Sequence, residues 1–508
     1  MAAKFSLDQR RAGVLLHPTS LPGPLGSGDL GRSAREFVDW LASAGMGWWQ
    51  MLPVVPVGPG NSPYSSTSAF AGTALLIDLG ALVRDGLLTR EEVRPPPGMR
   101  PERVRYPSVE RFRLSRLRMA QRRFSREAES GRLAAFEEFR TEQAGWLDDY
   151  TLFRALATRF KTTKWHQWPG EFRRRGRAAM ARARQELAAE IEFHAFVQFQ
   201  FERQWSALRA YAGQRGVGLM GDVPIFVAGE SSDVWANQEL FRLDAAGRAR
   251  EVSGCPPDSF SDTGQLWGHP LFAWPAHEKS GFRWWIARFR RTLALFDAVR
   301  IDHFLGFYQH WVVSGRAKTA QHGHYEESPG QALFRAVHAA IRRPQIVAED
   351  LGNVVQGAVE LRDALGYPGM RILQNAFWEG ARFDQPHNYP RNCVAYTGTH
   401  DNETALGWFK GLDGRRGADG LTTRARALRY LNARPGEIGE AMIRALYASP
   451  ANTVIVPMQD ILGLDNRGRM NTPATARGNW EWRMKPGAAT GRHAKRLREL
   501  AETYERKK

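Results

Sequence analysis

Eight short apolar runs, separated by segments with helical periodicity, constrain the fold of this chain more than any other feature. They cover residues 13–18, 48–54, 217–228, 297–304, 345–352, 370–377, 393–400 and 452–460. An apolar run that stops at a polar cluster is typical of a buried parallel strand whose tip lies at an active site. Strand and helix alternating in this way predict an α/β protein, a (β/α)8 TIM barrel. A doubly wound open sheet is the competing architecture, but it does not normally need eight such runs.

Helical periodicity fills the stretches between the runs. Residues 33–45 place Phe37, Leu41 and Ala44 on one face and end at Gly45. Helices are also expected at 193–212, 283–296 and 330–343, each before a strand, and at 493–506 near the C-terminus. The pattern predicts no β-domain after the barrel.

The chain has 508 residues, whereas a minimal barrel needs about 250. We therefore expect residues 1–508 to form a single catalytic barrel with large insertions in its βα loops. The first insertion, about 55–190, is expected to be a mostly helical subdomain, with a loop at 95–98 and a capping-box helix start at Thr89 and Glu92. The second, about 229–282, is rich in Trp, Gly and Pro and is expected to be an irregular subdomain of substrate loops.

Charge and composition narrow the classes of partner. Lys and Arg number 71 against 53 Asp and Glu, a net charge of +18 that suits nucleic-acid binding. However, the arginines alternate with Ala, Glu and Leu in the helical stretches 100–140 and 172–184, and no nucleic-acid motif accompanies them. Two cysteines imply no disulfide framework, and no segment has the apolar length of a membrane span. We expect a cytoplasmic protein with no nucleic-acid or membrane partner; the sequence does not determine its oligomeric state.

Three successive runs end in a carboxylate: Asp302, Glu349 and Asp401. A lone acid at a strand end is usually a helix cap or a surface residue. Three acids that repeat the pattern at successive strands are much harder to explain by capping alone. The sequence therefore predicts an acidic active site at the carboxyl ends of the strands.

Alternation within the fourth run separates its two faces. Val299 and Ile301 would face the outer helices, while Ala298, Arg300 and Asp302 would face the barrel axis. The Arg300 charge would keep Asp302 ionised at neutral pH, and an ionised, oriented carboxylate can act as a nucleophile. A buried salt bridge is the alternative.

Glu349 fits the second half of a two-carboxylate reaction, because a general acid whose pKa is raised holds its proton near neutrality. The neighbouring Asp350 points to the other side of the strand, and alternation does not say which of the two lines the axis. Asp401 lies past its strand tip beside His400, where a third acid can stabilise positive charge or bind hydroxyl groups. Two carboxylates around a sugar are the arrangement of a glycosidase.

Polar and aromatic side chains follow the other strands too. These are His17, Thr19, Ser20, Asn61, Ser62, Tyr64, Asp222, Gln459 and Asp460, with Trp235, Trp267, Trp274, Trp378 and Tyr389. Flat apolar rings beside hydrogen-bonding groups suit sugars, although ordinary core packing explains most single Trp residues. His322 and His324 lack a third ligand at a recognisable spacing, and no P-loop or dinucleotide fingerprint is present. We expect no metal and no cofactor.

At these residues the chain resembles the amylomaltases, 4-α-glucanotransferases also called disproportionating enzymes, of the α-amylase clan. The matching segments run from about residue 13 to 483: GVLLHPTSLPGPLGSGDLG, WWQMLPVVPVGPGNSPYSSTSAFAG, GDVPIFVA, CPPDSFSDTGQLWGHPLF, VRIDHFLGF, VAEDLG, GMRILQNAF, PHNY, YTGTHDN, RMNTP and GNWEWR. The departures are QNAFWEG (374–380) and AQHGHYEESPG (320–330), which differ from the family's usual residues.

The resemblance implies a retaining double displacement on α-1,4-glucans, with transfer of a segment to the 4-hydroxyl of glucose or another glucan. It makes Asp302 the nucleophile, Glu349 the acid and base, and Asp401 the transition-state stabiliser. The positions implied to bind substrate are Tyr64, Ser62, Asp222, Gln265, Trp267, Arg300, His400 and Asn471.

Two rival functions remain at this point. A retaining α-glucan hydrolase of the same clan would let water intercept the glucosyl-enzyme. A catalytically idle protein that binds glucans or polyanions would need none of the three acids.

Overall fold

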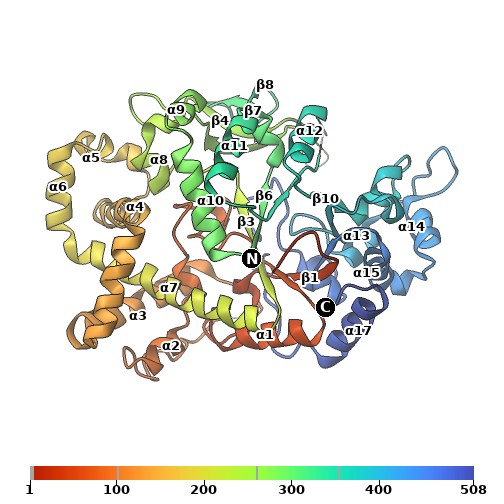
Figure 1. The fold of residues 1–508 in the computed structure, drawn as a ribbon, viewed down its shortest axis with the longest axis horizontal. Coiled ribbons are helices and arrows are strands. Elements are labelled where there is room, and N and C mark those ends of the chain that lie inside the picture. The colour runs from red at the N-terminus through yellow and green to blue at the C-terminus, as the bar shows by residue number, and fades with distance from the viewer. Residues whose placement is uncertain (1–4, 100–101, 259–260, 353–354, 508) are drawn as a thin grey trace.

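The eight apolar runs form the eight strands of one sheet in the computed structural model, which describes residues 5–99, 102–258, 261–352 and 355–507. The strands are β1 (Arg11–Leu15), β2 (Trp48–Gln50), β3 (Gly218–Pro224), β6 (Ala298–Asp302), β9 (Ile346–Ala348), β10 (Gly369–Ile372), β11 (Cys393–Tyr396) and β12 (Thr453–Pro457). All neighbouring pairs are parallel, in the order β10-β11-β12-β1-β2-β3-β6-β9. Figure 1 shows β1, β3 and β6 at the centre of the molecule.

Both ends of the strand order meet, so the sheet is a barrel. The last strand, β12, pairs with the first, with Thr453 opposite Arg11. On the other side, the N–H of Ala348 in β9 donates to the carbonyl of Pro368, just before β10, at 2.9 Å. The predicted (β/α)8 architecture is confirmed, and the open doubly wound sheet is excluded.

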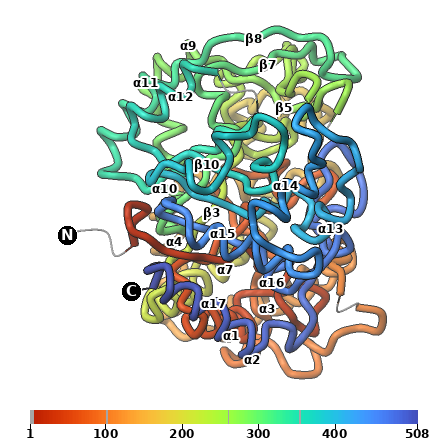
Figure 2. Tube along the Cα trace, turned by 90° about the vertical axis from the view of Figure 1, so that its right-hand side faces the viewer, coloured from red at the N-terminus to blue at the C-terminus, as the bar shows by residue number. Residues whose placement is uncertain are grey.

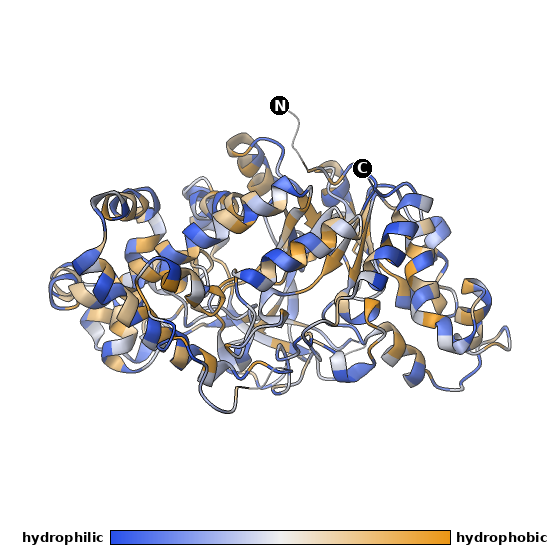
Figure 3. Ribbon diagram, turned by 90° about the horizontal axis from the view of Figure 1, so that it is seen from below, coloured by the Kyte–Doolittle hydropathy of each residue, from blue (hydrophilic) through white to orange (hydrophobic). Residues whose placement is uncertain are grey.

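Helices form in the stretches where periodicity predicted them, and also at several places between residues 356 and 461 where none was predicted individually. They are α1 (Arg32–Ser43), α2 (Leu79–Arg84), α3 (Tyr106–Glu127), α4 (Ser130–Phe160), α5 (Gly170–Arg173), α6 (Arg177–Glu186), α7 (Ala188–Gln214), α8 (Ser232–Ala236), α9 (Trp274–Lys279), α10 (Arg283–Leu295), α11 (Gly330–Ala340), α12 (Gln356–Ala364), α13 (Ala405–Gly411), α14 (Thr423–Leu431), α15 (Ile438–Ala448), α16 (Met458–Ile461) and α17 (Gly491–Thr503). Phe37 and Leu41 of α1 are buried as expected, and Gly45 reverses the chain with a φ of 73°. Viewed from below, the helices are hydrophilic on their outer sides and the central strands are hydrophobic (Figure 3). Among the described residues, no helix has both the length and the apolar character to span a bilayer.

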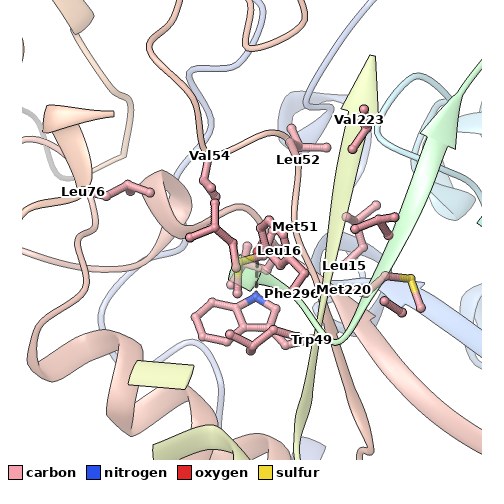
Figure 4. Packing of buried hydrophobic residues seen from close by; sticks show 14 of the residues in the cluster. Leu15, Leu16, Trp49, Met51, Leu52, Val54, Leu76, Met220, Val223 and Phe296 are labelled. Carbon is pink, nitrogen blue, oxygen red and sulfur yellow. Dashed lines mark hydrogen bonds between the residues drawn. The ribbon is translucent and has the colours of Figure 1, made fainter. Parts of the chain in front are cut away.

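The core is continuous between the barrel strands and their first loops. Trp49 is fully buried, and its indole N–H donates to the carbonyl of Leu16 at 2.8 Å (Figure 4). Gly13 of β1 leaves room for the neighbouring strand, because a Cβ there would lie 2.6 Å from the Cβ of Trp48. Close packing at Gly13 allows β1 and β2 to lie side by side.

Helices α3 to α6 follow β2 and precede β3 in the sequence, and they form the orange and yellow side of the molecule in Figure 1, away from α14 and α15.

The predicted start of a helix at Thr89 and Glu92 is wrong. Thr89 and Glu92 exchange the two capping hydrogen bonds, at 2.8 and 3.3 Å, but residues 90–93 form a turn and not a helix. Three prolines at 95–97 follow and prevent a helix from continuing.

A second, antiparallel sheet lies beside the barrel and was not predicted. It consists of β4 (Glu251–Cys255), β5 (Gln265–Pro270), β7 (Gln309–Ser314) and β8 (His324–Glu327), in the order β5-β4-β7-β8. Figure 2 places β5, β7 and β8 at the end of the molecule opposite α1 and α2. Residues 229–282 are therefore not uniformly irregular: two of these strands fall within them. Gly254 and Gly268 interrupt the alternation that would have revealed these strands.

Candidate active site

Arg300 is the centre of a buried network at the tips of β3 and β6. Its Nη1 donates to both carboxylate oxygens of Asp222, at 2.9 and 2.8 Å, and its Nη2 lies 2.9 Å from Oδ1 of Asp302. The Asp222 side chain is fully buried, whereas that of Asp302 is 29% exposed. Burial alone would lower the pKa of Arg300, but Asp222 and Asp302 outweigh it and raise that pKa well above its ordinary value. Arg300 therefore stays positively charged beside Asp302.

Glu349 follows β9 and is held by two main-chain donors. Its Oε2 accepts from the N–H of His303 at 2.7 Å, and its Oε1 accepts from the N–H of Leu351 at 2.9 Å. Burial, with the negative charge of Asp302, raises the pKa of Glu349 to about 7 against the opposing effect of Arg300. This carboxyl group therefore retains a proton near neutral pH.

Asp350 lies on the other side of the same strand end. It forms an ion pair with Arg362 of α12 and accepts from the N–H of Met370 at 2.7 Å. Strand alternation did not say whether Glu349 or Asp350 lines the barrel axis. The contacts show that Glu349 is the acid that shares a site with Asp302 and Arg300.

Asp401 lies in the loop after β11. Its Oδ1 accepts from Nδ2 of Asn471 at 2.6 Å, and its Oδ2 is 3.3 Å from Nε2 of His400. Nη2 of Arg469 donates to its main-chain carbonyl at 2.6 Å. Burial lowers the pKa of His400, which Asp401 opposes, so a neutral imidazole is favoured beside the carboxylate.

Tyr64 connects the Asp222 and His400 sides of the site. Its hydroxyl donates to Oδ2 of Asp222 at 2.8 Å, and its ring stacks on His400 with centroids 5.2 Å apart and planes at 12°. Ser62 shapes this loop, since its Oγ accepts from the N–H of Tyr64 at 3.2 Å. Trp480 flanks both rings, at centroid distances of 5.6 Å from Tyr64 and 5.9 Å from His400.

Gln265 and Trp267 reach the site from the second sheet. The indole N–H of Trp267 donates to Oε1 of Gln265 at 3.4 Å, and its ring meets that of His303 edge to face at 4.9 Å. Nε2 of Gln265 donates to Oδ2 of Asp258 at 2.6 Å. The β4–β5 hairpin is therefore connected by contacts to the loop that follows Asp302.

All of the site residues expected from the sequence lie at the carboxyl ends of barrel strands, in the loops that follow them, or on β5 beside them. Three neighbours were not singled out: His303, Asp258 and Trp480. They fall inside the quoted motifs, but nothing in their residue types distinguishes a site contact from core or loop packing. The left-handed backbone of His303, with a φ of 52°, has no signal in the sequence.

Comparisons of sequence and structure identify known proteins that are similar to this chain. The family model described as 4-alpha-glucanotransferase matches residues 16–490. The chain is 43% identical to the 4-alpha-glucanotransferase of Thermus thermophilus, over 98% of this chain and 99% of that one. It is also 43% identical to the chloroplastic/amyloplastic 4-alpha-glucanotransferase of Solanum tuberosum, over 98% of this chain and 87% of that one. Among solved structures, the amylomaltase from Streptococcus agalactiae in complex with acarbose matches with a TM-score of 0.94 and 37% identity, covering 98% of this chain and 100% of that one.

Proposed function

Since the chain belongs to the 4-alpha-glucanotransferase family and is an enzyme of that activity, we propose that Asp302 and Glu349 divide a retaining double displacement between them. Asp302 attacks the anomeric carbon of the donor glucan, and Glu349 protonates the departing glycosidic oxygen. A covalent glucosyl-enzyme results. Glu349, now a carboxylate, then removes the proton of the acceptor 4-hydroxyl, which displaces Asp302 from the sugar.

The different surroundings of the two carboxyl groups are the observation that carries this proposal. Asp302 lies against the Arg300 guanidinium at 2.9 Å and is partly exposed, which suits a nucleophile. Glu349 is held by main-chain N–H groups, and its pKa is raised to about 7, which suits a proton donor at neutral pH. One group is thus ready to attack while the other is ready to donate.

Asp401, with His400 and Asn471, is proposed to stabilise the positively charged transition state. A carboxylate fixed by a 2.6 Å bond from Asn471 needs little reorganisation when charge develops on the sugar. Tyr64, already stacked on His400, is proposed to contact the donor glucose, and Gln265 and Trp267 to contact the glucan from the hairpin side. The S. agalactiae amylomaltase binds acarbose, and we expect the site around Asp302 and Glu349 to accept the same oligosaccharide.

Incubation of the pure enzyme with maltotriose tests the reaction. Transfer gives glucose together with a ladder of longer oligomers, whereas hydrolysis gives glucose and maltose alone. Asp302→Asn and Glu349→Gln should each lower the rate by several orders of magnitude, because each removes a group that acts in the transition state. Full activity in either variant would disprove the assignment of that residue.

A further inference from the structure

His303, the residue directly after Asp302, has a left-handed main chain with φ 52° and ψ 51°. Residues other than glycine adopt this region infrequently, because their Cβ approaches the carbonyl oxygen. Such strain persists where the surrounding structure enforces it, and it concentrates at functional sites. The contacts of His303 should therefore show which interactions this backbone conformation makes possible.

In the left-handed turn two successive N–H groups, those of His303 and Phe304, donate to the same residue, Glu349. The N–H of His303 donates to Oε2 of Glu349 at 2.7 Å, and the N–H of Phe304 donates to the main-chain carbonyl of Glu349 at 3.0 Å. In an extended strand, successive N–H groups point in opposite directions and would not converge in this way. The turn is what allows the end of β6 to hold both the side chain and the main chain of Glu349.

The imidazole of His303 is engaged elsewhere. It packs edge to face against Trp267, with centroids 4.9 Å apart. Its Cδ2 atom would lie 3.1 Å from a Cβ at position 306, so Gly306 gives the ring its room. The ring and the main chain of His303 thus have separate contacts and can be tested separately.

We propose that His303 is a positioning residue for the transferase reaction: the left-handed conformation of its main chain, and not its imidazole, lets its own N–H and that of Phe304 converge on Glu349 and so holds the carboxyl group in place. The inference rests on the role proposed above for Glu349. It follows that a side chain at 303 matters through the backbone conformation it permits. Glycine and asparagine permit a positive φ, whereas a β-branched residue opposes it.

The decisive comparison is between His303→Gly, His303→Asn and His303→Val, measured as kcat, KM and the pH profile of kcat/KM with maltotriose. All three lose the ring, so a loss common to them reports the contact with Trp267, chiefly in KM. The Val variant should lose a further factor of roughly ten to a hundred in kcat, since a small displacement of a catalytic group has that effect. Its basic pH limb should also move up by about one unit, because the lost bond favours the carboxylate form of Glu349.

The groups that act electrostatically on Glu349 stay the same in these variants. They are Arg300 and Asp302 on β6 and Cys255 on β4. A matched control is Lys161→Val, since Lys161 is exposed and has a φ of 55° at the end of α4. It should lose thermal stability as His303→Val does, with kcat and the pH limb unchanged.

If His303→Val does not fold, His303→Ala should change kcat and the basic pH limb in the same direction but by less, because its single Cβ opposes a positive φ more weakly. Equal kcat and equal pH limbs in the Gly, Asn and Val variants would overturn the inference. That result is distinct from failure of the proposed function, in which Glu349→Gln itself would retain activity.

Discussion

Asp222 and Arg300 stand directly opposite each other in the paired strands β3 and β6, and Nη1 of Arg300 contacts both carboxylate oxygens of Asp222. Both side chains are almost completely buried, at 0% and 4% exposure. The same guanidinium reaches Asp302, and the same carboxylate accepts the hydroxyl of Tyr64. Strand register therefore sets the relative positions of the proposed nucleophile and the ring proposed to contact the donor sugar.

Removing one member of the Asp222–Arg300 pair should destabilise the folded protein. Asp222→Ala leaves the buried Arg300 charge without its main partner, and we expect a loss of about 3–5 kcal/mol in the free energy of unfolding. Chemical denaturation measures it. The control is Glu36→Ala, which removes the exposed 2.6 Å pair with Arg32 and should change stability by less than about 0.5 kcal/mol. Equal effects of the two changes would contradict the role given to Asp222.

Activity should fall as the pH rises through the pKa of Glu349. The general acid must be protonated in the free enzyme, and burial raises its pKa to about 7. The basic limb of the kcat/KM profile should therefore lie near pH 7, well above the ordinary range of a glutamate. A limb at pH 5 or below would show that another group donates the proton.

The same pKa predicts an effect on stability. In the folded chain Glu349 keeps its proton up to about pH 7, whereas its ordinary value is 4.5. Between these values the folded state binds more protons than the unfolded state, so the stability contributed by Glu349 is lost as the pH rises. Glu349→Gln removes this penalty, and its gain in melting temperature over the parent should be larger at pH 8 than at pH 4. A gain that is the same at both pH values would contradict the raised pKa.

Two substitutions at Tyr64 can separate the effect of its ring stacking on kcat/KM from the effect of its hydrogen bond. Tyr64→Phe keeps the ring on His400 but removes the 2.8 Å bond to Asp222, and should reduce kcat/KM by roughly tenfold. Tyr64→Ala removes both and should reduce it further, mainly through KM for maltotriose. Two variants with the same kcat/KM would show that the ring itself contributes nothing.

Gly13 should not tolerate a larger residue. In Gly13→Ala the new methyl group would lie 2.6 Å from the Cβ and 2.7 Å from the carbonyl oxygen of Trp48. Overpacking of this kind costs about 1–3 kcal/mol, which thermal unfolding detects. Gly145→Ala is the counterpart, because Gly145 lies in the interior of α4 with nothing within 4 Å of its ideal Cβ. It should gain about 0.5–1 kcal/mol from the higher helix propensity of alanine.

The barrel was predictable because its strands are buried on both faces and so appear as short, mostly apolar runs. Alternation in the fourth run also gave the correct face for Arg300, since the pleat has a fixed period of two. The second sheet was not predictable in this way. Gly254 in β4 and Gly268 in β5 break the pattern that would have distinguished these two strands from loops, and β8 (His324–Glu327) is mostly polar.

The candidate site was predictable as a set of residues but not as a set of contacts. Carboxylates at strand tips pointed to Asp302, but alternation left Glu349 and Asp350 as alternatives, and only the resemblance to the amylomaltases favoured Glu349. In the structure Asp350 pairs with Arg362, which lies twelve residues further along. The hydrogen bond from His303 to Glu349 depends on a backbone angle. No pattern of polarity encodes that angle.

The pairing of β1 with β12 also has a consequence for synthesis of the chain. Residues 453–457 supply the neighbour that Arg11–Leu15 requires, so the ring of strands stays open until these residues have left the ribosome. Arg506 follows α17, is buried, and donates to the carbonyls of Tyr447 and Ala451, so it can fix α17 in place only after that. A premature stop before codon 453 would release a product with two unprotected strand edges, prone to aggregation and proteolysis.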